Sequence, residues 1–198
     1  MIKVVIFDAD GVIVQSKRKF SIKLEEEHDI SRDMTLPFFN GPFQDCLVGV
    51  CDLKETISPY LPVWGWDRGV DEFLDVWFKA EHKVDEELAE YVLSLREQGV
   101  LCLLGTNNEK HRFNYMLDKM GLKNIFDKTY ASATLGHKKP DQEFFSKIYE
   151  ELGTVNKGEI LFVDDSIENI QGAGDFGFHT EFYTSMENLK KKISLLSE

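Results

Sequence analysis

Short apolar runs alternate with amphipathic segments along most of this chain, and that alternation restricts its fold more than any other feature. An apolar run of four to eight residues between polar or glycine residues predicts a buried strand. The predicted strands are Val4–Phe7, Val100–Leu104, Thr129–Ala131, Ile160–Val163 and Thr180–Tyr183. Strands that alternate with helices form a parallel sheet with right-handed crossovers. We therefore expect an α/β fold with helices on both faces of the sheet.

The segments between these strands carry apolar residues at helical spacing and have recognisable ends. Asp85 is a suitable N-cap for one helix, and Gly99 ends it. A second helix is predicted from about Glu109 to Met120, a third opens at Pro140 and Asp141, and a fourth begins near Glu168. The complete pattern predicts a Rossmann-like doubly wound sheet, in which ligands bind beyond the carboxyl ends of the strands.

Residues 15–84 do not follow this alternation and predict a small helical insert. The segment contains the helical stretches Phe20–His28 and Val70–Ala80. It also holds four prolines and all the tryptophans: Pro37, Pro42, Pro59, Pro62, Trp64, Trp66 and Trp77. We interpret these aromatic residues as packing. Lys17, Arg18 and Lys19 near its start could meet a substrate, although such a turn is more commonly solvent-exposed. The expected organisation is a discontinuous core of residues 1–14 and 85–198 with a helical cap of residues 15–84.

The charge and the cysteines restrict partners and location. A formal net charge of −12 argues against nucleic acid as a partner, because affinity for its phosphate backbone requires clustered Lys and Arg. No apolar run approaches the length of a membrane span, and no leader of basic and apolar residues is visible, so we expect no membrane partner. Cys46, Cys51 and Cys102 show no CxxC spacing. A reducing, cytoplasmic location fits these observations.

Chemically active side chains stand at the ends of four predicted strands. They are Asp8 and Asp10, then Gly105 to Asn108 with Thr106 among them, then Lys138 and Lys139, and finally Asp164 and Asp165. Parallel strands bring these groups to one crevice. Carboxylates about 4 Å apart repel by roughly 4 kcal/mol at an effective dielectric near 20, which favours a bound divalent metal. A carboxylate that can attack, a hydroxyl, an ammonium and an acidic pair together indicate phosphoryl transfer.

The motifs at these strand ends resemble those of the haloacid dehalogenase-like (HAD) hydrolase superfamily, in its branch with a helical cap between the first and second motifs. The matching segments, in order, are FDADGV, LLGTNN, KKPD and FVDDSIENI. The resemblance covers the whole region of the predicted sheet. It implies a magnesium-dependent phosphatase that acts on a small phosphorylated metabolite, such as a sugar phosphate, through an aspartyl-phosphate.

The same resemblance implies a role for each motif residue. Asp8 is the nucleophile and Asp10 the general acid and base. Thr106 and the amides of Asn107 and Asn108 hold the phosphate at a helix amino terminus, and Lys139 neutralises charge. The residues implied to hold Mg²⁺ are Asp8, Asp10 through its backbone carbonyl, Asp164 and Asp165. Asn169 either hydrogen-bonds the loop of the acidic pair or is an ordinary polar residue at a helix start.

Three other functions use similar residues. A phosphomutase shares the aspartyl-phosphate, and nothing in the motifs shows whether water or a substrate hydroxyl receives the phosphoryl group. A dehalogenase needs neither an acid at Asp10 nor a metal, so the acids present argue against it. A phospho-receiver signalling domain also has acids, a Thr and a Lys, but its phosphorylated Asp follows the third strand. Here the candidate nucleophile follows the first, which argues against a receiver domain. Hydrolysis is favoured among the enzymes because many members of the similar family with small caps are phosphatases.

Overall fold

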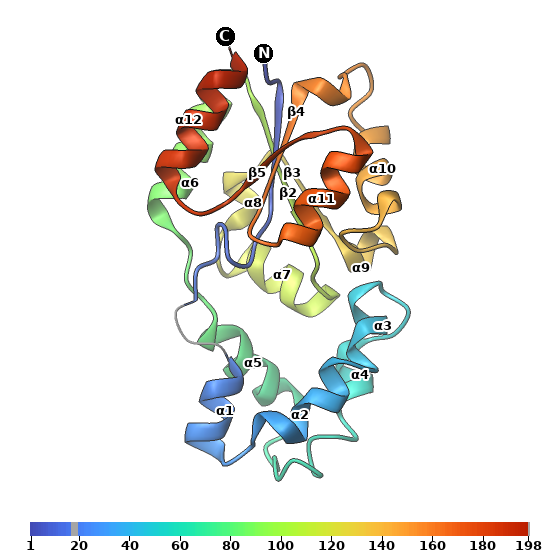
Figure 1. Cartoon of the computed structure of the whole chain (residues 1–198). Coiled ribbons are helices and arrows are strands. Elements are labelled where there is room, and N and C mark those ends of the chain that lie inside the picture. Colours follow the sequence, from blue (N-terminus) through green and yellow to red (C-terminus); the bar gives the residue numbers. More distant parts are fainter. Residues whose placement is uncertain (17–19, 198) are drawn as a thin grey trace.

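The predicted α/β fold is confirmed by the computed structural model, which describes residues 1–16 and 20–197. Five parallel strands form one sheet in the order β3-β2-β1-β4-β5. Their bounds are β1 Val4–Phe7, β2 Leu101–Thr106, β3 Lys128–Ala131, β4 Ile160–Asp164 and β5 His179–Phe182. This arrangement places β1 in the centre, where both of its faces are covered (Figure 1).

Alternate residues of the central strands face two different helical layers. Val5 and Phe7 belong to the apolar cluster of α6, α7, α8 and α12, whereas Val4 and Ile6 belong to that of α10 and α11. The bounds are α6 Glu86–Glu97, α7 Lys110–Asp118, α8 Leu122–Ile125, α9 Ser132–Leu135, α10 Gln142–Glu150, η1 Lys157–Glu159, α11 Ile167–Phe176 and α12 Met186–Ser197. Burial on both faces explains why the strands are apolar throughout rather than alternating.

The predicted elements are present, with shifts at their ends. The strand predicted to end at Leu104 continues to Thr106, because Gly105 and Thr106 pair with Tyr130 and Ala131 of β3. The last strand ends at Phe182, one residue before the predicted end. Helix α7 begins at Lys110, after Glu109 accepts hydrogen bonds from the backbone N–H groups of its first turn. The short helices α8 and α9 carry too few residues to show a helical period.

Residues 20–80 form five helices around an aromatic core of their own. The helices are α1 Phe20–His28, α2 Arg32–Phe39, α3 Phe43–Leu47, α4 Leu53–Ile57 and α5 Val70–Ala80. Trp64, Trp66 and Trp77 are buried in this core, which confirms their interpretation as packing residues. Lys17, Arg18 and Lys19 lie outside the described residues. The separate core supports our proposal that residues 15–84 are a cap on the sheet domain.

The two segments that connect the insert to the sheet domain lie side by side. The backbone N–H of Gln15 donates to the carbonyl of Lys83 at 2.8 Å, and Val14 forms a bridge with Val84. In Figure 1 the insert lies beneath the carboxyl ends of the strands, with α7 between it and the sheet. Within the part of the chain that the structure describes, no helix is both long and apolar enough to cross a bilayer.

Candidate active site

Three carboxylates and one ammonium gather at the carboxyl ends of β1 and β4. Asp8, Asp164 and Asp165 each offer an oxygen, and these oxygens all lie within 4.8 Å of one another. Lys139 Nζ lies 2.7 Å from Asp8 Oδ1 and 2.7 Å from Asp164 Oδ2. The structure thus brings together residues from three separate segments of the sequence. Three acids against one ammonium leave an excess of negative charge, and Asp8 and Asp164 are buried whereas Asp165 is exposed.

Burial shapes the electrostatics of this cluster. Desolvation raises the pKa of Asp8 to about 7; Lys139 opposes the shift, while Asp164 and Asp10 add to it. Burial also disfavours the ammonium of Lys139, but the carboxylates of Asp8 and Asp164 outweigh it and raise the pKa of Lys139. Lys139 is therefore charged at neutral pH, and it offsets only part of the negative charge.

The donor set fits a small hard cation. Mg²⁺ prefers carboxylate and carbonyl oxygens and usually binds one or two protein carboxylates together with water and phosphate. Asp8, Asp164 and Asp165 supply such oxygens in one place, and a divalent charge matches the excess that Lys139 leaves. The predicted contribution of the backbone carbonyl of Asp10 stays a prediction.

Asp164 is held by the N-terminal end of α11, which follows β4 closely. The side-chain amide of Asn169 donates to Asp164 Oδ1 at 3.0 Å and to Oδ2 at 3.1 Å. The backbone N–H of Ser166 donates to Asp164 Oδ1 at 2.8 Å. Of the two interpretations of Asn169, the structure therefore supports the one in which its side chain bonds the acidic loop. Such outer hydrogen bonds orient carboxylates that bind metals.

Gly11 makes the space that Asp165 occupies. Its φ is +87°, which favours glycine, and a Cβ built there would lie 1.9 Å from Asp165 Oδ2. Because glycine has no side chain, the carboxylate of Asp165 can lie directly against the Gly11 backbone. A side chain at position 11 would displace that carboxylate.

The variant Gly11→Ala is therefore expected to weaken binding of a divalent cation by about 10- to 100-fold, which is the usual loss when the groups that orient a metal ligand are disturbed. Isothermal titration with Mg²⁺ measures this. Gly121→Ala is the matched control, because Gly121 has φ +78° and no atom within 4 Å of a built Cβ. Both variants carry backbone strain, so equal loss of cation affinity in the two would contradict a specific effect on Asp165.

The segment after β2 leads directly into helix α7. Helix α7 begins at Lys110, and the carboxylate of Glu109 already accepts from the N–H groups of His111 and Arg112. Asn107 and Asn108 therefore stand directly before the N-cap of α7, and contact of their amides with a phosphate stays a prediction. Any phosphate contact from their amides comes from a loop, because the ladder with β3 extends β2 to Thr106.

The side chains of this loop are bonded within the protein. Asn107 donates to the carbonyl of Lys139 at 2.9 Å and accepts from its backbone N–H at 2.8 Å. Asn107 thus fixes the loop that carries Lys139. Thr106 is buried, and its hydroxyl accepts from Asn108 Nδ2 at 2.8 Å. The proposed phosphate contacts of Thr106, Asn107 and Lys139 stay predictions that this geometry allows.

The side chains of Asp8 and Asp10 diverge, although residues i and i+2 of a strand face the same way. Asp8 contacts Lys139, whereas Asp10 Oδ1 accepts from Arg112 Nη2 at 2.9 Å and Oδ2 accepts from Asn108 Nδ2 at 3.0 Å. The rule that residues i and i+2 face the same way fails because β1 ends at Phe7. Asp10 is therefore paired with the guanidinium of Arg112.

Arg112 is the functional candidate that sequence reasoning missed. Its side chain is buried on α7, and it lies between Asp10 and Glu81, at the end of α5. A signal was available, because Arg112 stands four residues before Met116 and next to Phe113, on the apolar face of that helix. A charged residue on a buried helix face needs partners.

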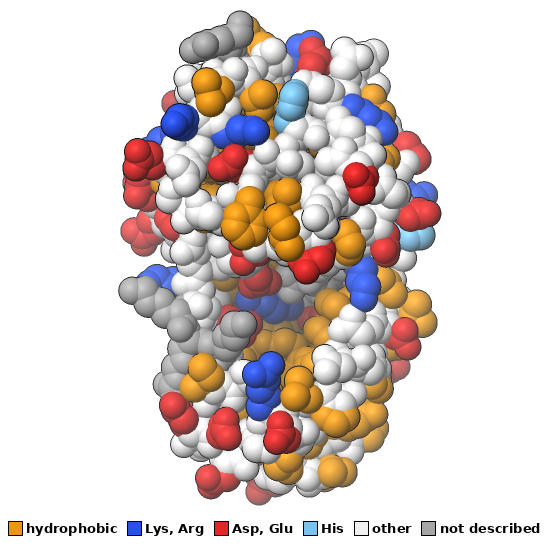
Figure 2. All heavy atoms as spheres, viewed as in Figure 1, with side chains coloured by type: hydrophobic (Ala, Val, Ile, Leu, Met, Phe, Trp, Pro, Cys, Tyr) orange, Lys and Arg blue, Asp and Glu red, His pale blue; other side chains and the backbone are white. Residues whose placement is uncertain are grey.

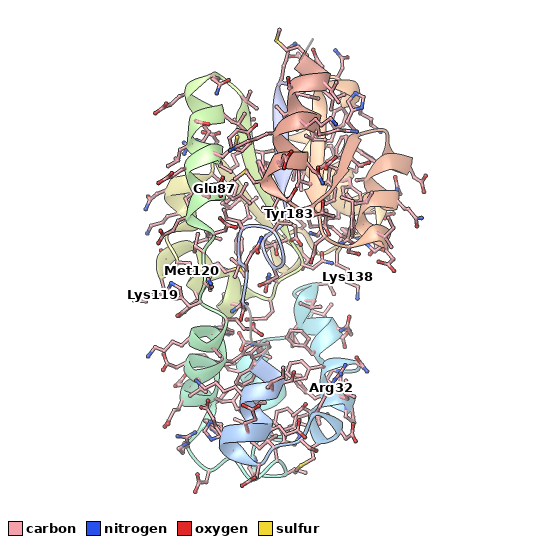
Figure 3. The ribbon with its side chains drawn as sticks, turned by 60° about the vertical axis from the view of Figure 1, so that its left-hand side comes forward. Arg32, Glu87, Lys119, Met120, Lys138 and Tyr183 are labelled. Atoms are coloured by element: carbon pink, nitrogen blue, oxygen red, sulfur yellow. The ribbon has the colours of Figure 1, made fainter. Side chains whose placement is uncertain are left out.

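The cleft between the sheet domain and the insert leads to this site. A pocket of about 490 Å³ is lined by Asp10, Gly11, Val14, Gln15, Ser16, Glu81 and Asp165. Figure 2 shows charged side chains within the hollow between the two halves. Farther along the boundary, Lys138 Nζ donates to Gln44 at 2.7 Å and His111 Nε2 lies 2.8 Å from Asp52 Oδ2. Lys138 is thus at the border with the insert (Figure 3), beside the site and not in it.

Comparisons with known proteins agree on a family. A family model described as haloacid dehalogenase-like hydrolase matches residues 5–181. A D-ribitol-5-phosphate phosphatase of Bacteroides thetaiotaomicron is 28% identical over 188 residues, which are 91% of this chain and 91% of that protein. A HAD family enzyme from the same organism, solved as a mutant with magnesium and inorganic phosphate, has a TM-score of 0.84 at 20% identity and covers 98% of this chain and 99% of its own. A HAD-like hydrolase structure from Porphyromonas gingivalis has a TM-score of 0.83 at 24% identity, covering 100% and 98%.

Proposed function

The chain belongs to the haloacid dehalogenase-like hydrolase family, and from this premise we propose that it is a magnesium-dependent phosphatase that hydrolyses a small phosphorylated metabolite. The observation that carries the proposal is the cluster of Asp8, Asp164 and Asp165 around Lys139 at the carboxyl ends of the sheet. Attack by a carboxylate on a phosphate monoester brings anions together, so the site must supply compensating positive charge.

Mg²⁺, held by Asp8, Asp164 and Asp165 with the carbonyl of Asp10, supplies that positive charge when bound. Lys139 adds a fixed ammonium beside Asp8, and its surroundings keep it charged. The hydroxyl of Thr106 and the loop amides of Asn107 and Asn108 are placed to hold phosphate oxygens. Asn107 keeps Lys139 in place through its two hydrogen bonds with the Lys139 backbone.

Two displacements at phosphorus complete the reaction. In the first, a carboxylate oxygen of Asp8 forms a bond to phosphorus, the ester P–O bond breaks, and the leaving alcohol oxygen takes a proton from Asp10. In the second, Asp10 accepts a proton from water as the water oxygen attacks phosphorus. The bond between phosphorus and Asp8 then breaks, which releases inorganic phosphate and restores both side chains.

A phosphorylated polyol or sugar is the substrate class that we propose. The relative from Bacteroides thetaiotaomicron acts on D-ribitol 5-phosphate, and its similarity extends over 91% of both chains. The pocket beside Asp10 is about 490 Å³ and is lined by polar side chains such as Gln15 and Glu81. Such a space suits a short hydroxylated chain, because its hydroxyl groups can replace hydrogen bonds to water.

The proposal is tested by measuring phosphate release from polyol and sugar phosphates with Mg²⁺ and with a chelator. Removal of the metal is expected to lower kcat at least about 10³-fold, equivalent to about 4 kcal/mol of transition-state stabilisation. Restored activity on addition of Mg²⁺, with an unchanged circular dichroism spectrum, excludes unfolding as the cause. Full activity in the chelator would contradict the proposed site, and an isomerised sugar without free phosphate would indicate a phosphomutase.

The proposal includes a cytoplasmic location and no nucleic-acid partner. Cys46, Cys51 and Cys102 are free thiols, which suits a reducing compartment. The net charge of −12 opposes association with polyanions, and a negatively charged substrate must be attracted by the cations of the site, which are Lys139 and bound Mg²⁺.

A further inference from the structure

We propose that Arg112 is a positioning residue, which orients the carboxyl group of Asp10 for proton transfer and ties it to the insert through Glu81. This inference rests on the proposed phosphatase function, in which Asp10 is the general acid and base. It concerns a residue outside the four sequence motifs, and it links the position of the insert to proton transfer by Asp10.

The guanidinium of Arg112 bridges the two halves of the molecule. Its Nη2 lies 2.9 Å from Asp10 Oδ1 in the sheet domain and 3.3 Å from Glu81 Oε2 at the end of α5. The Arg112 side chain is only 4% exposed. Its Nη1 is buried and has no hydrogen-bond partner in the described residues. Among the buried side-chain N and O atoms of residues 1–16 and 20–197, it is the one in this state. Burial of an incompletely paired guanidinium is costly, so a purely stabilising role explains it poorly.

Glu81 connects this bridge to both ends of the insert. Its Oε1 accepts from the backbone N–H of Phe20, the first residue of α1, at 3.2 Å. Its Oε2 accepts from Trp77 Nε1 on α5 at 3.1 Å. These two helices are the first and last of the insert. A movement of the insert against the sheet domain would therefore displace Glu81 and, with it, the position that Arg112 adopts beside Asp10.

Asp10 depends on such support. Its side chain is 49% exposed, and it is not packed in place. Arg112 bonds one carboxyl oxygen and Asn108 the other, and Asn108 also donates to the Thr106 hydroxyl. With one of the two donors removed, the carboxyl group is free to rotate. A displacement of about 1 Å in a reacting group can cost on the order of 10²-fold in rate.

Activity on two phosphate esters shows whether Arg112 positions the general acid Asp10 or only stabilises the fold. An alkyl ester such as ribitol 5-phosphate releases an alkoxide that needs a proton, whereas p-nitrophenyl phosphate releases a stable anion. The ratio kcat/KM reports formation of the aspartyl-phosphate. For Arg112→Met we expect kcat/KM to fall about 10²-fold on the alkyl ester, within the range of general acid catalysis, and only a few-fold on the aryl ester. Glu81→Ala is expected to act in the same direction with a smaller effect.

Arg96→Met is the matched control. Arg96 pairs with Asp127 at 2.8 Å and bonds the carbonyls of Asn124 and Ile125, away from the site. Its loss is expected to lower the melting temperature and leave the ratio of the two kcat/KM values unchanged. Arg112→Lys keeps a cationic donor and is expected to restore part of the alkyl-ester activity.

Three outcomes would overturn the inference: equal losses on both esters in Arg112→Met, no loss on either, or no recovery in a folded Arg112→Lys. A failure of the proposed function looks different, because the wild-type protein would then release phosphate from neither ester. Thermal melting of every variant shows whether it is folded at the assay temperature, so a loss of structure is not mistaken for a loss of positioning.

Discussion

Replacing Asp8 by asparagine is expected to abolish turnover, with a fall in kcat of at least about 10⁴-fold, in the range seen when a nucleophile is removed. The amide oxygen of asparagine is a poor nucleophile, whereas the carboxylate of Asp8 stands within 2.7 Å of the ammonium that would neutralise the developing charge. Phosphate release from a polyol phosphate in the presence of Mg²⁺ measures the loss.

The intermediate provides a second and more direct readout of the same variant. Wild-type protein quenched in acid during turnover should yield a phosphorylated peptide that contains Asp8, and Asp8→Asn should yield none. Beryllium trifluoride is expected to bind the same carboxylate when it is soaked into crystals of the wild-type protein. Undiminished turnover in the purified variant, or a phosphorylated residue elsewhere, would remove Asp8 from the nucleophilic role.

The variant is also expected to remain folded, because the buried carboxylate of Asp8 lowers the folding stability of the metal-free protein. Burial raises its pKa to about 7, above the ordinary value of 3.8. The folded state therefore holds a proton more tightly than the unfolded state, and stability falls as pH rises from about 4 to 7. Above pH 7 the cost of the buried charge is fully present. Without metal, Asp8→Asn should melt no lower than the wild type at pH 8, which separates inactivity from unfolding.

The fold could be predicted from the sequence because each strand carries its own signal. Val4–Phe7 is apolar at every position, since helices cover both faces of the central strand. The end of β2 was not predictable in the same way. Gly105 and Thr106 remain extended because they pair with Tyr130 and Ala131, and such pairing is a tertiary interaction that no local pattern contains.

Part of the candidate site could likewise be predicted from the sequence, and part depends on tertiary contacts. Asp8 and Asp164 lie close together because β1 and β4 are neighbouring parallel strands that end at one edge of the sheet. Lys139 reaches both from the loop after α9, whose backbone is bonded to Asn107. The direction of the Asp10 side chain depends instead on Arg112, which is 102 positions away in the sequence. That contact needs α7 and the insert to be in place, and only the three-dimensional structure supplies it.

Replacing Lys139 by methionine is expected to lower both stability and activity by large amounts. Its ammonium lies 2.7 Å from Asp8 and 2.7 Å from Asp164, and the side chain is 1% exposed. Removing one partner of a buried ion pair leaves an uncompensated charge and costs about 3–5 kcal/mol. Loss of a preorganised cation at the reacting group lowers kcat by about 10²- to 10³-fold.

The stability deficit should depend on pH in a defined direction. Contact with Asp8 and Asp164 raises the pKa of Lys139 despite burial, so its favourable contribution is complete below pH 10.5 and is lost only above that. In Lys139→Met the acids have no counter-charge, and their repulsion decreases as they bind protons. Chemical denaturation without metal is therefore expected to show a larger deficit at pH 8 than at pH 5.

Lys138→Met isolates this effect, because the neighbouring lysine makes one hydrogen bond to Gln44 and none to the acids in the described part of the chain. Its stability should stay within about 1 kcal/mol of the wild type, with turnover close to normal. Mg²⁺ should raise the melting temperature of Lys139→Met more than that of either other protein, since the metal then offsets all three carboxylates by itself. If Mg²⁺ stabilised the wild type and Lys139→Met equally, the two cations would not share the same negative charge, and the electrostatic basis of the site would have to be abandoned.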